Sequence, residues 1–161
     1  MAESVRKLKN TSMILDDLLQ GIVLLKTVGS TDMQIENIQF DSRKVEAGSL
    51  FVAIKGTAAD GHQYITTAIE KGAVAVVCED LPADLAPNIT YIKVENSSDA
   101  LGKMASAWYG FPSSKMTLVG VTGTNGKTTI ATLLYQLFRK LGHKSGLLST
   151  VCNYVDEVAV E

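Results

Sequence analysis

Hydrophobic positions divide the chain into short continuous runs and longer segments with helical spacing. Continuous apolar runs bounded by glycine or polar residues are typical of buried strands, whereas apolar residues recurring every three or four positions indicate helices. On these criteria the first part of the chain contains strands at residues 35–40, 50–54, 74–78 and 90–94, and helices at 13–19, 63–71 and 100–109. Thr11 and Ser12 are the expected N-cap of the first helix. Strand, helix and strand at this spacing predict a right-handed parallel crossover and therefore an α/β fold.

The same pattern starts again in the last third of the chain. A strand is predicted over residues 116–121, a helix over 127–141 and a further strand over 145–150. Two strands and one helix cannot cover both faces of a parallel sheet, and about 65 residues is close to the size at which a lone core becomes marginal. We therefore expect an N-terminal α/β domain followed by the truncated start of a larger parallel-sheet domain. The boundaries that we assign are a polar extension over 1–12, a first domain over 13–96 and an incomplete second domain over 97–161, with the helix at 100–109 able to belong to either side.

Composition and charge narrow the class of protein. Of the 161 residues 46% are hydrophobic and 20% are charged, which is typical of a globular chain. No apolar stretch approaches the roughly 18 to 20 residues that cross a bilayer, and the short run at 13–19 is interrupted by acids, unlike a signal-peptide core. The net charge of −2 shows no excess of basic residues of the kind that binds nucleic acid. The two cysteines define neither a disulfide framework nor a zinc site. We expect a cytoplasmic monomer without nucleic-acid or membrane partners.

The strongest chemical signal is a glycine-rich loop between the predicted strand and helix of the second domain. Residues 120–129 read Gly-Val-Thr-Gly-Thr-Asn-Gly-Lys-Thr-Thr. Glycines let main-chain N–H groups converge on an anion, and the helix N-terminus adds roughly half a positive charge there. Lys127 can reach the β- and γ-phosphates of a nucleotide, and the Thr128 hydroxyl can coordinate Mg²⁺. The predicted nucleotide contacts are Gly123, Thr124, Asn125, Gly126, Lys127, Thr128 and Thr129, with Lys127 in the catalytic role and Thr128 as the metal ligand.

These residues resemble the ATP signature of the Mur ligase family. The general phosphate-loop motif has glycine where this chain has Val121, but the family's Gly-x-x-Gly-x-x-Gly-Lys rhythm accommodates that residue. Upstream, the Asp-Ser-Arg at 41–43, the run at 48–53 and the Asp-Gly-His at 60–62 resemble the N-terminal domain of the ligases that add the third residue or the terminal dipeptide of the peptide stem. The resemblance covers nearly all of residues 13–153.

The resemblance implies an ATP- and Mg²⁺-dependent amide ligase of cytoplasmic peptidoglycan precursor synthesis. The Thr-Asn pair inside the loop and residues 149–153 look more like the member that adds meso-diaminopimelate or L-lysine to UDP-N-acetylmuramoyl-L-alanyl-D-glutamate than like the dipeptide-adding member. Another amide ligase, such as folylpolyglutamate synthetase, and a non-catalytic nucleotide-binding module remain alternatives.

Substrate contacts also come from the resemblance. Phe40 and Ser42 match positions that contact the UDP-sugar, and Thr57, Ala58 and Ala59 match a second contact stretch. The amino-acid substrate would bind to a C-terminal domain beyond residue 161, so we expect the 161-residue chain alone not to turn over.

Four further features are expected to have structural roles. Arg43 could bind a diphosphate or, as we favour, pair with an acid of its own domain. His62 is expected to make hydrogen bonds at a helix start rather than to act in catalysis, and Cys78 to be a small apolar filler. The aromatic residues at 108–111 are expected to pack between the two domains rather than to stack on a base.

Overall fold

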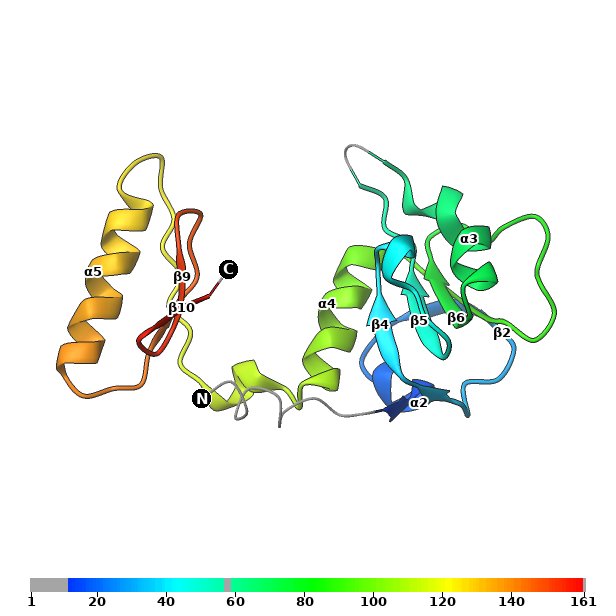
Figure 1. The fold of residues 1–161 in the computed structure, drawn as a ribbon, viewed down its shortest axis with the longest axis horizontal. Coiled ribbons are helices and arrows are strands. Elements are labelled where there is room, and N and C mark those ends of the chain that lie inside the picture. The colour runs from blue at the N-terminus through cyan, green and yellow to red at the C-terminus, as the bar shows by residue number, and fades with distance from the viewer. Residues whose placement is uncertain (1–11, 57–58, 161) are drawn as a thin grey trace. The chain divides into compact units, whose positions relative to one another are not determined.

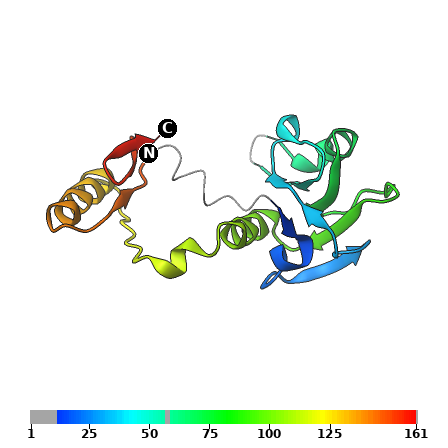
Figure 2. The ribbon, with the colours of Figure 1, turned by 60° about the horizontal axis from the view of Figure 1, so that its bottom comes forward.

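A computed structural model describes residues 12–56 and 59–160 of the chain. The chain forms two compact units that divide between Met116 and Thr117 (Figures 1 and 2). None of the helices in these described ranges is both long enough and apolar enough to cross a membrane.

The first unit is built on a five-stranded sheet with the strand order β2-β7-β6-β5-β4. The strands are β2 (Leu24–Val28), β4 (Asn37–Gln39), β5 (Ser49–Val52), β6 (Ala73–Cys78) and β7 (Thr90–Val94). Strands β4 to β7 are parallel and follow one another in chain order, while β2 pairs antiparallel with β7 at the opposite edge. A separate two-stranded ribbon joins β1 (Met13–Ile14) to β3 (Gln34–Ile35).

Helices cover both faces of this sheet. The helix α3 (Ile65–Glu70), entered through a 3₁₀ turn at Gly61–Tyr64, packs on one face, and α2 (Leu15–Leu18) and α4 (Ser97–Trp108) pack on the other (Figure 1). The sequence of β6 explains this arrangement, because a strand that is buried on both faces is apolar at consecutive positions. Ala75 and Val77 lie in the cluster with α4, whereas Val76 and Cys78 lie in the cluster with α3. The predicted α/β class and the parallel crossover from β5 through α3 to β6 are confirmed.

The helix predicted over residues 13–19 is wrong in extent. Only Leu15–Leu18 is helical, because Met13 and Ile14 pair as a strand with Ile35 and Gln34. Ser12 does not cap the helix, since its hydroxyl donates to the side chain of Gln34, and Thr11 lies outside the described residues. The strand predicted over 35–40 is divided in the same way between β3 and β4, and β2 was not predicted.

Helix α4 belongs to the first unit. Its residues Ala100, Met104 and Trp108 are buried in the same cluster as Leu50 and Ile92 of the sheet. The division of the chain therefore falls after residue 116, later than the predicted boundary at 96. Trp108 accordingly packs inside the first unit rather than between domains.

The second unit contains α5 (Lys127–Lys140) and three short strands, β8 (Gly146–Leu147), β9 (Asn153–Val155) and β10 (Val158–Val160). These strands pair antiparallel in the order β10-β9-β8, so the parallel sheet of the fold prediction is found only in the first unit among the described residues. The predicted helix at 127–141 is confirmed. Arg139 of α5 forms ion pairs with Asp156 and Glu157 of the β9–β10 turn.

The strand predicted before the glycine-rich loop is wrong. Residues 117–122 belong to no sheet, and Leu118 and Val119 are 71% and 61% exposed. An apolar run forms a strand only where a neighbouring strand satisfies its main-chain groups, and none of the described strands pairs with this segment. The strand predicted over 145–150 is shortened to β8.

Candidate functional site

The glycine-rich loop enters α5 through backbone conformations that side chains rarely adopt. Gly126 immediately precedes the helix with φ +76°, and Gly123 has φ +150°. A Cβ atom added to Gly126 would meet nothing within 4 Å. The glycine is therefore required by its left-handed backbone and not by lack of space.

The start of α5 presents main-chain donors to solvent. The first N–H groups of a helix have no acceptor within the helix, and no side chain caps this one in the described structure. The first helical hydrogen bond runs from the N–H of Ile130 to the carbonyl of Gly126, at 2.9 Å. The N–H groups of residues 127–129 are thus available to an anion, with the helix dipole adding to the attraction.

Lys127 folds back over the loop instead of extending into solvent. Its Nζ donates to the carbonyl oxygen of Gly123 at 2.6 Å and lies 3.4 Å from that of Thr124. Thr128 is half-buried, while Thr124, Asn125 and Thr129 are exposed. The structure therefore brings the predicted loop residues, the ammonium group and the helix N-terminus together at one place.

A metal at this loop would depend on ligands besides the protein. The described residues contain no group of three His, Cys, Asp or Glu side chains that could hold a metal ion. The hydroxyl of Thr128 suits Mg²⁺, which is usually held by one or two protein oxygens together with phosphates and water. The Thr128 hydroxyl therefore suits a Mg²⁺ ion whose remaining ligands are nucleotide phosphates and water.

Three of the five predicted substrate contacts of the first unit lie at one edge of its sheet. Phe40 and Ser42 follow β4, and Ala59 follows β5, so all three lie beyond the carboxyl ends of adjacent parallel strands, where open α/β sheets bind ligands. Phe40 is 63% exposed. Thr57 and Ala58 lie outside the described residues.

Arg43 pairs with an acid of its own domain, as favoured from the sequence. Its Nε and one terminal nitrogen donate to the two carboxylate oxygens of Asp41 at 2.9 and 2.8 Å, and its main-chain N–H donates to the same carboxylate at 3.0 Å. These hydrogen bonds to the Arg43 side chain and backbone lower the pKa of Asp41 to about 2. The pair fixes the 3₁₀ turn that carries Ser42.

His62 makes the expected hydrogen bonds at the start of the segment leading into α3. Its main-chain N–H donates to Asp60 Oδ1 at 3.0 Å, and its Nδ1 lies 2.6 Å from the same oxygen. These bonds lower the pKa of Asp60. Its Nε2 also accepts from the main-chain N–H groups of Glu79 and Asp80, at 3.0 and 3.3 Å. This second contact was missed from the sequence, because no local pattern links His62 to residues at the end of β6.

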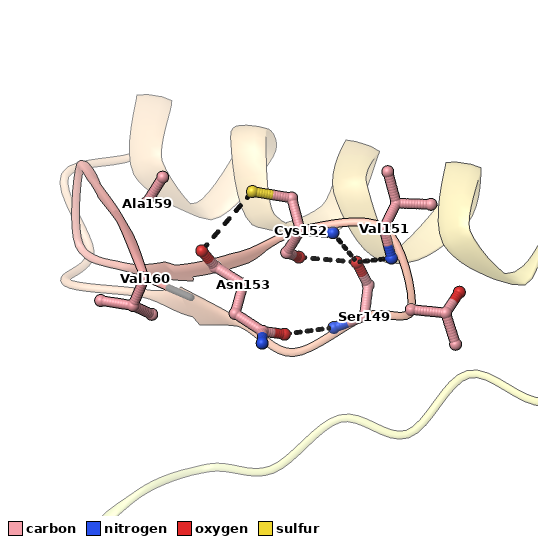
Figure 3. A pocket seen from close by; sticks show the side chains of 7 residues that line it. Ser149, Val151, Cys152, Asn153, Ala159 and Val160 are labelled. Carbon is pink, nitrogen blue, oxygen red and sulfur yellow. Dashed lines mark hydrogen bonds between the residues drawn. The ribbon is translucent and has the colours of Figure 1, made fainter.

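A hollow of about 460 Å³ lies in the second unit beyond the carboxyl end of β8 (Figure 3). Its lining comprises Ser149, Thr150, Val151, Cys152, Asn153, Ala159 and Val160. The Ser149 hydroxyl donates to the carbonyl of Cys152 at 2.6 Å, and Asn153 Oδ1 accepts from the N–H of Ser149 at 3.0 Å (Figure 3). The loop is thus braced by its own polar groups.

Two family models match the chain in succession. The model described as Mur ligase family, catalytic domain, matches residues 34–109, and the Mur ligase middle domain matches residues 121–161. The chain belongs to the Mur ligase family. The division between the two units falls in the gap between the two matched regions.

Curated Mur ligases resemble the chain closely over most of its length. It is 60% identical over 148 residues to the UDP-N-acetylmuramoyl-L-alanyl-D-glutamate–2,6-diaminopimelate ligase of Parabacteroides distasonis, and 57% identical over 148 residues to the ligase of the same name from Phocaeicola vulgatus. Each match covers 92% of this chain but only 30% and 31% of the relative, respectively. The chain therefore spans about three tenths of the length of these relatives.

Solved Mur ligase structures share the fold. A UDP-N-acetylmuramoyl-L-alanyl-D-glutamate–2,6-diaminopimelate ligase superposes with a TM-score of 0.65 at 22% identity, over 92% of this chain and 30% of that one. The D-alanyl-D-alanyl-adding ligase from Acinetobacter baumannii gives 0.57 at 23% identity, over 81% of this chain and 28% of that one. At these identities the likeness concerns the fold alone.

Proposed function

We propose that the chain is the UDP-sugar-binding and ATP-binding part of an ATP-dependent ligase that adds 2,6-diaminopimelate to UDP-N-acetylmuramoyl-L-alanyl-D-glutamate. The observation that carries this proposal is the identity of 57% to 60% with ligases of that name over 92% of the chain. The same relatives favour diaminopimelate over L-lysine, and favour the third-residue-adding ligase over the dipeptide-adding one. A cytoplasmic location follows from the pathway in which such a ligase acts.

The chemistry requires an activated carboxylate. An amine cannot displace oxide from a carboxylate at a useful rate, so the carboxylate first takes the γ-phosphoryl group of ATP to give an acyl phosphate. The amine then attacks the acyl carbon, and phosphate leaves. Because the reacting groups are all anionic, the protein must place positive charge and fixed donors where they meet.

The loop of the second unit has the groups for this task. In our proposal Lys127 exchanges its bond with the carbonyl of Gly123 for one with the β- and γ-phosphates, and the N–H groups of the loop and helix start bind the phosphate oxygens. Thr128 would hold Mg²⁺, which supplies further neutralisation of phosphate charge when bound. Gly123, Thr124, Asn125, Gly126 and Thr129 complete the nucleotide contacts.

The first unit takes the UDP moiety in this proposal. The proposed contacts are Phe40 and Ser42 beyond β4 and Ala59 beyond β5, together with Thr57 and Ala58, which lie outside the described residues. Binding of ATP and of UDP to the 161-residue chain, each measured by isothermal titration calorimetry, tests the two halves separately.

Lys127→Met tests the ATP half. Loss of a charged hydrogen bond corresponds to about 1.5 to 3 kcal/mol, so the dissociation constant for ATP–Mg²⁺ should rise roughly 10- to 150-fold while that for UDP stays unchanged. Lys140→Met, an exposed lysine at the far end of the same helix, is the matched control and should leave both constants as they are. Unaltered ATP affinity in Lys127→Met would contradict the proposed nucleotide site, and absence of UDP binding to the unmodified chain would contradict the proposed substrate domain.

A further inference from the structure

Three loops at the carboxyl edge of the first sheet are joined by one set of hydrogen bonds. Asp60 and His62 follow β5, Glu79 and Asp80 follow β6, and Ser97 follows β7. The side chain of His62 bridges the first loop to the second through its contacts with Asp60 and with the two N–H groups at 79 and 80. These loops form the edge at which the substrate contacts are proposed.

The partners of His62 define its protonation. Asp60 is a carboxylate and can only accept, so Nδ1 carries the proton and donates to it. The main-chain N–H groups of Glu79 and Asp80 can only donate, so Nε2 offers its lone pair to both. His62 is therefore neutral in this arrangement, and neither ring nitrogen is free for proton transfer or metal binding. Its task at this edge is to hold two loops together.

The next link in the set is Glu79. One of its carboxylate oxygens accepts from the main-chain N–H of Ser97 at 3.0 Å and from the Ser97 hydroxyl at 2.9 Å, at the start of α4. Ser97 is completely buried, and Lys55 pairs with Asp80 at 2.9 Å on the exposed side. The segment that follows β6 is thus held in place by its contacts with Ser97 and Lys55. His62 bonds the loop after β5 to this segment.

The loop after β5 is closed tightly at its base. The N–H of Gly61 donates to the carbonyl of Ile54 at 2.8 Å, and a Cβ on Gly61 would lie only 2.7 Å from the nitrogen of Ile54. The N–H of Gly56 donates to the carbonyl of Ala59 at 3.1 Å. The position of Ala59 therefore depends on the same base that His62 anchors.

We propose that His62 is a positioning residue for the UDP moiety, which it serves by holding the loop that carries Ala59 against the end of β6. The inference rests on the proposed function and adds to it a residue that does not touch the ligand. A residue that only stabilised the first unit would change its unfolding free energy without changing the UDP affinity of chains that remain folded. Because the two ligands are proposed to bind different units, the decisive readout is the UDP affinity of the fully folded chain, and the ATP affinity reports only that the second unit is intact.

Two amide variants separate the two contacts of the imidazole. In His62→Gln the longer side chain places its carbonyl oxygen near the position of Nε2, where it can accept from Glu79 and Asp80. In His62→Asn the shorter side chain reaches only the position of Nδ1 and keeps the contact with Asp60. We expect the dissociation constant for UDP to rise about tenfold in His62→Asn and to stay within about threefold of the unmodified chain in His62→Gln. The constant for ATP–Mg²⁺ should not change in either variant.

Calorimetry at a temperature well below both unfolding midpoints measures these constants. Equal UDP affinity in both variants and the unmodified chain would overturn the role of His62, as would an equal loss of UDP and ATP affinity. If the unmodified chain does not bind UDP, the proposed function itself fails, and the role of His62 with it.

A measurement on the unmodified chain covers the case in which His62→Asn does not fold. Hydrogen exchange of the Glu79 and Asp80 amides, followed by NMR, should slow when UDP is added at saturation, because the ligand stabilises the closed loop to which they are bonded. Exchange rates that UDP leaves unchanged would count against the proposal.

Discussion

Gly126 offers a sharp test of how the loop conformation supports nucleotide binding. Its φ of +76° lies in the left-handed region, which costs a residue with a side chain about 1 to 2 kcal/mol. Since a Cβ there would contact nothing within 4 Å, Gly126→Ala adds backbone strain without a steric clash. The alanine variant should relieve that strain by altering the helix entrance, and ATP must then restore the original conformation. The dissociation constant for ATP–Mg²⁺ should accordingly rise roughly 5- to 30-fold.

The opposite end of the same helix supplies the matched control. Gly142 follows α5 with φ +84°, and a Cβ there would also meet nothing within 4 Å. Gly142→Ala should therefore lower the unfolding free energy by a similar amount, about 1 to 2 kcal/mol, with no change in ATP affinity. Gly126→Asn should recover part of the loss, because asparagine tolerates the left-handed region better than alanine.

Calorimetric titration with ATP–Mg²⁺ and urea denaturation of the three variants complete the experiment. The reasoning is refuted if Gly126→Ala binds ATP as well as the unmodified chain does. It is equally refuted if Gly142→Ala weakens ATP binding to the same extent, since the effect would then come from general destabilisation of the helix.

Three further predictions concern the first unit and the cysteines. Met104→Ala should lower the unfolding free energy by about 2 to 5 kcal/mol in urea denaturation, because Met104 is completely buried between α4 and the sheet. The pKa of Asp41 is lowered to about 2, so this carboxylate stabilises the fold above about pH 4 and loses that contribution as the pH falls toward 2. Hydrogen bonds from Ser97 lower the pKa of Glu79 as well, so its contribution is also present above about pH 4 and is lost as the pH falls through that lowered pKa. The urea midpoint should fall over this window, and fall less in Asp41→Asn. Burial raises the pKa of Cys78 to about 11, so a thiol reagent at pH 8 should modify the half-buried Cys152 and leave Cys78 unmodified until the chain unfolds.

The sequence could predict those elements whose burial or backbone conformation follows from their own residues. The consecutive apolar residues of β6 require burial on both faces, and the glycines and Lys127 require a loop at a helix start; both predictions agree with the structure. The helix over 13–19 failed because Met13 and Ile14 find partners in β3, which only the folded chain brings near. The prediction of a strand before the glycine-rich loop was wrong because no described strand pairs with these residues, and an apolar run alone does not supply a pairing partner.

The candidate site could be predicted from the sequence only where its residues are contiguous. The loop residues are contiguous and carry their own pattern, so their placement could be inferred directly. The anchoring of His62 to residues 79 and 80 could not be inferred, because its acceptor nitrogen meets main-chain donors that any residue type would provide. Such contacts arise only when the chain folds and brings the two loops together.

The order of strands in the first sheet has a consequence for the way in which the chain folds during synthesis. From β4 to β7 each new strand pairs with the one made just before it, so these four can assemble as they leave the ribosome. Strand β2 is made before all of them, yet its partner β7 is the last of the five. It therefore cannot pair within this sheet until β7 has been made, about 60 residues later in the chain.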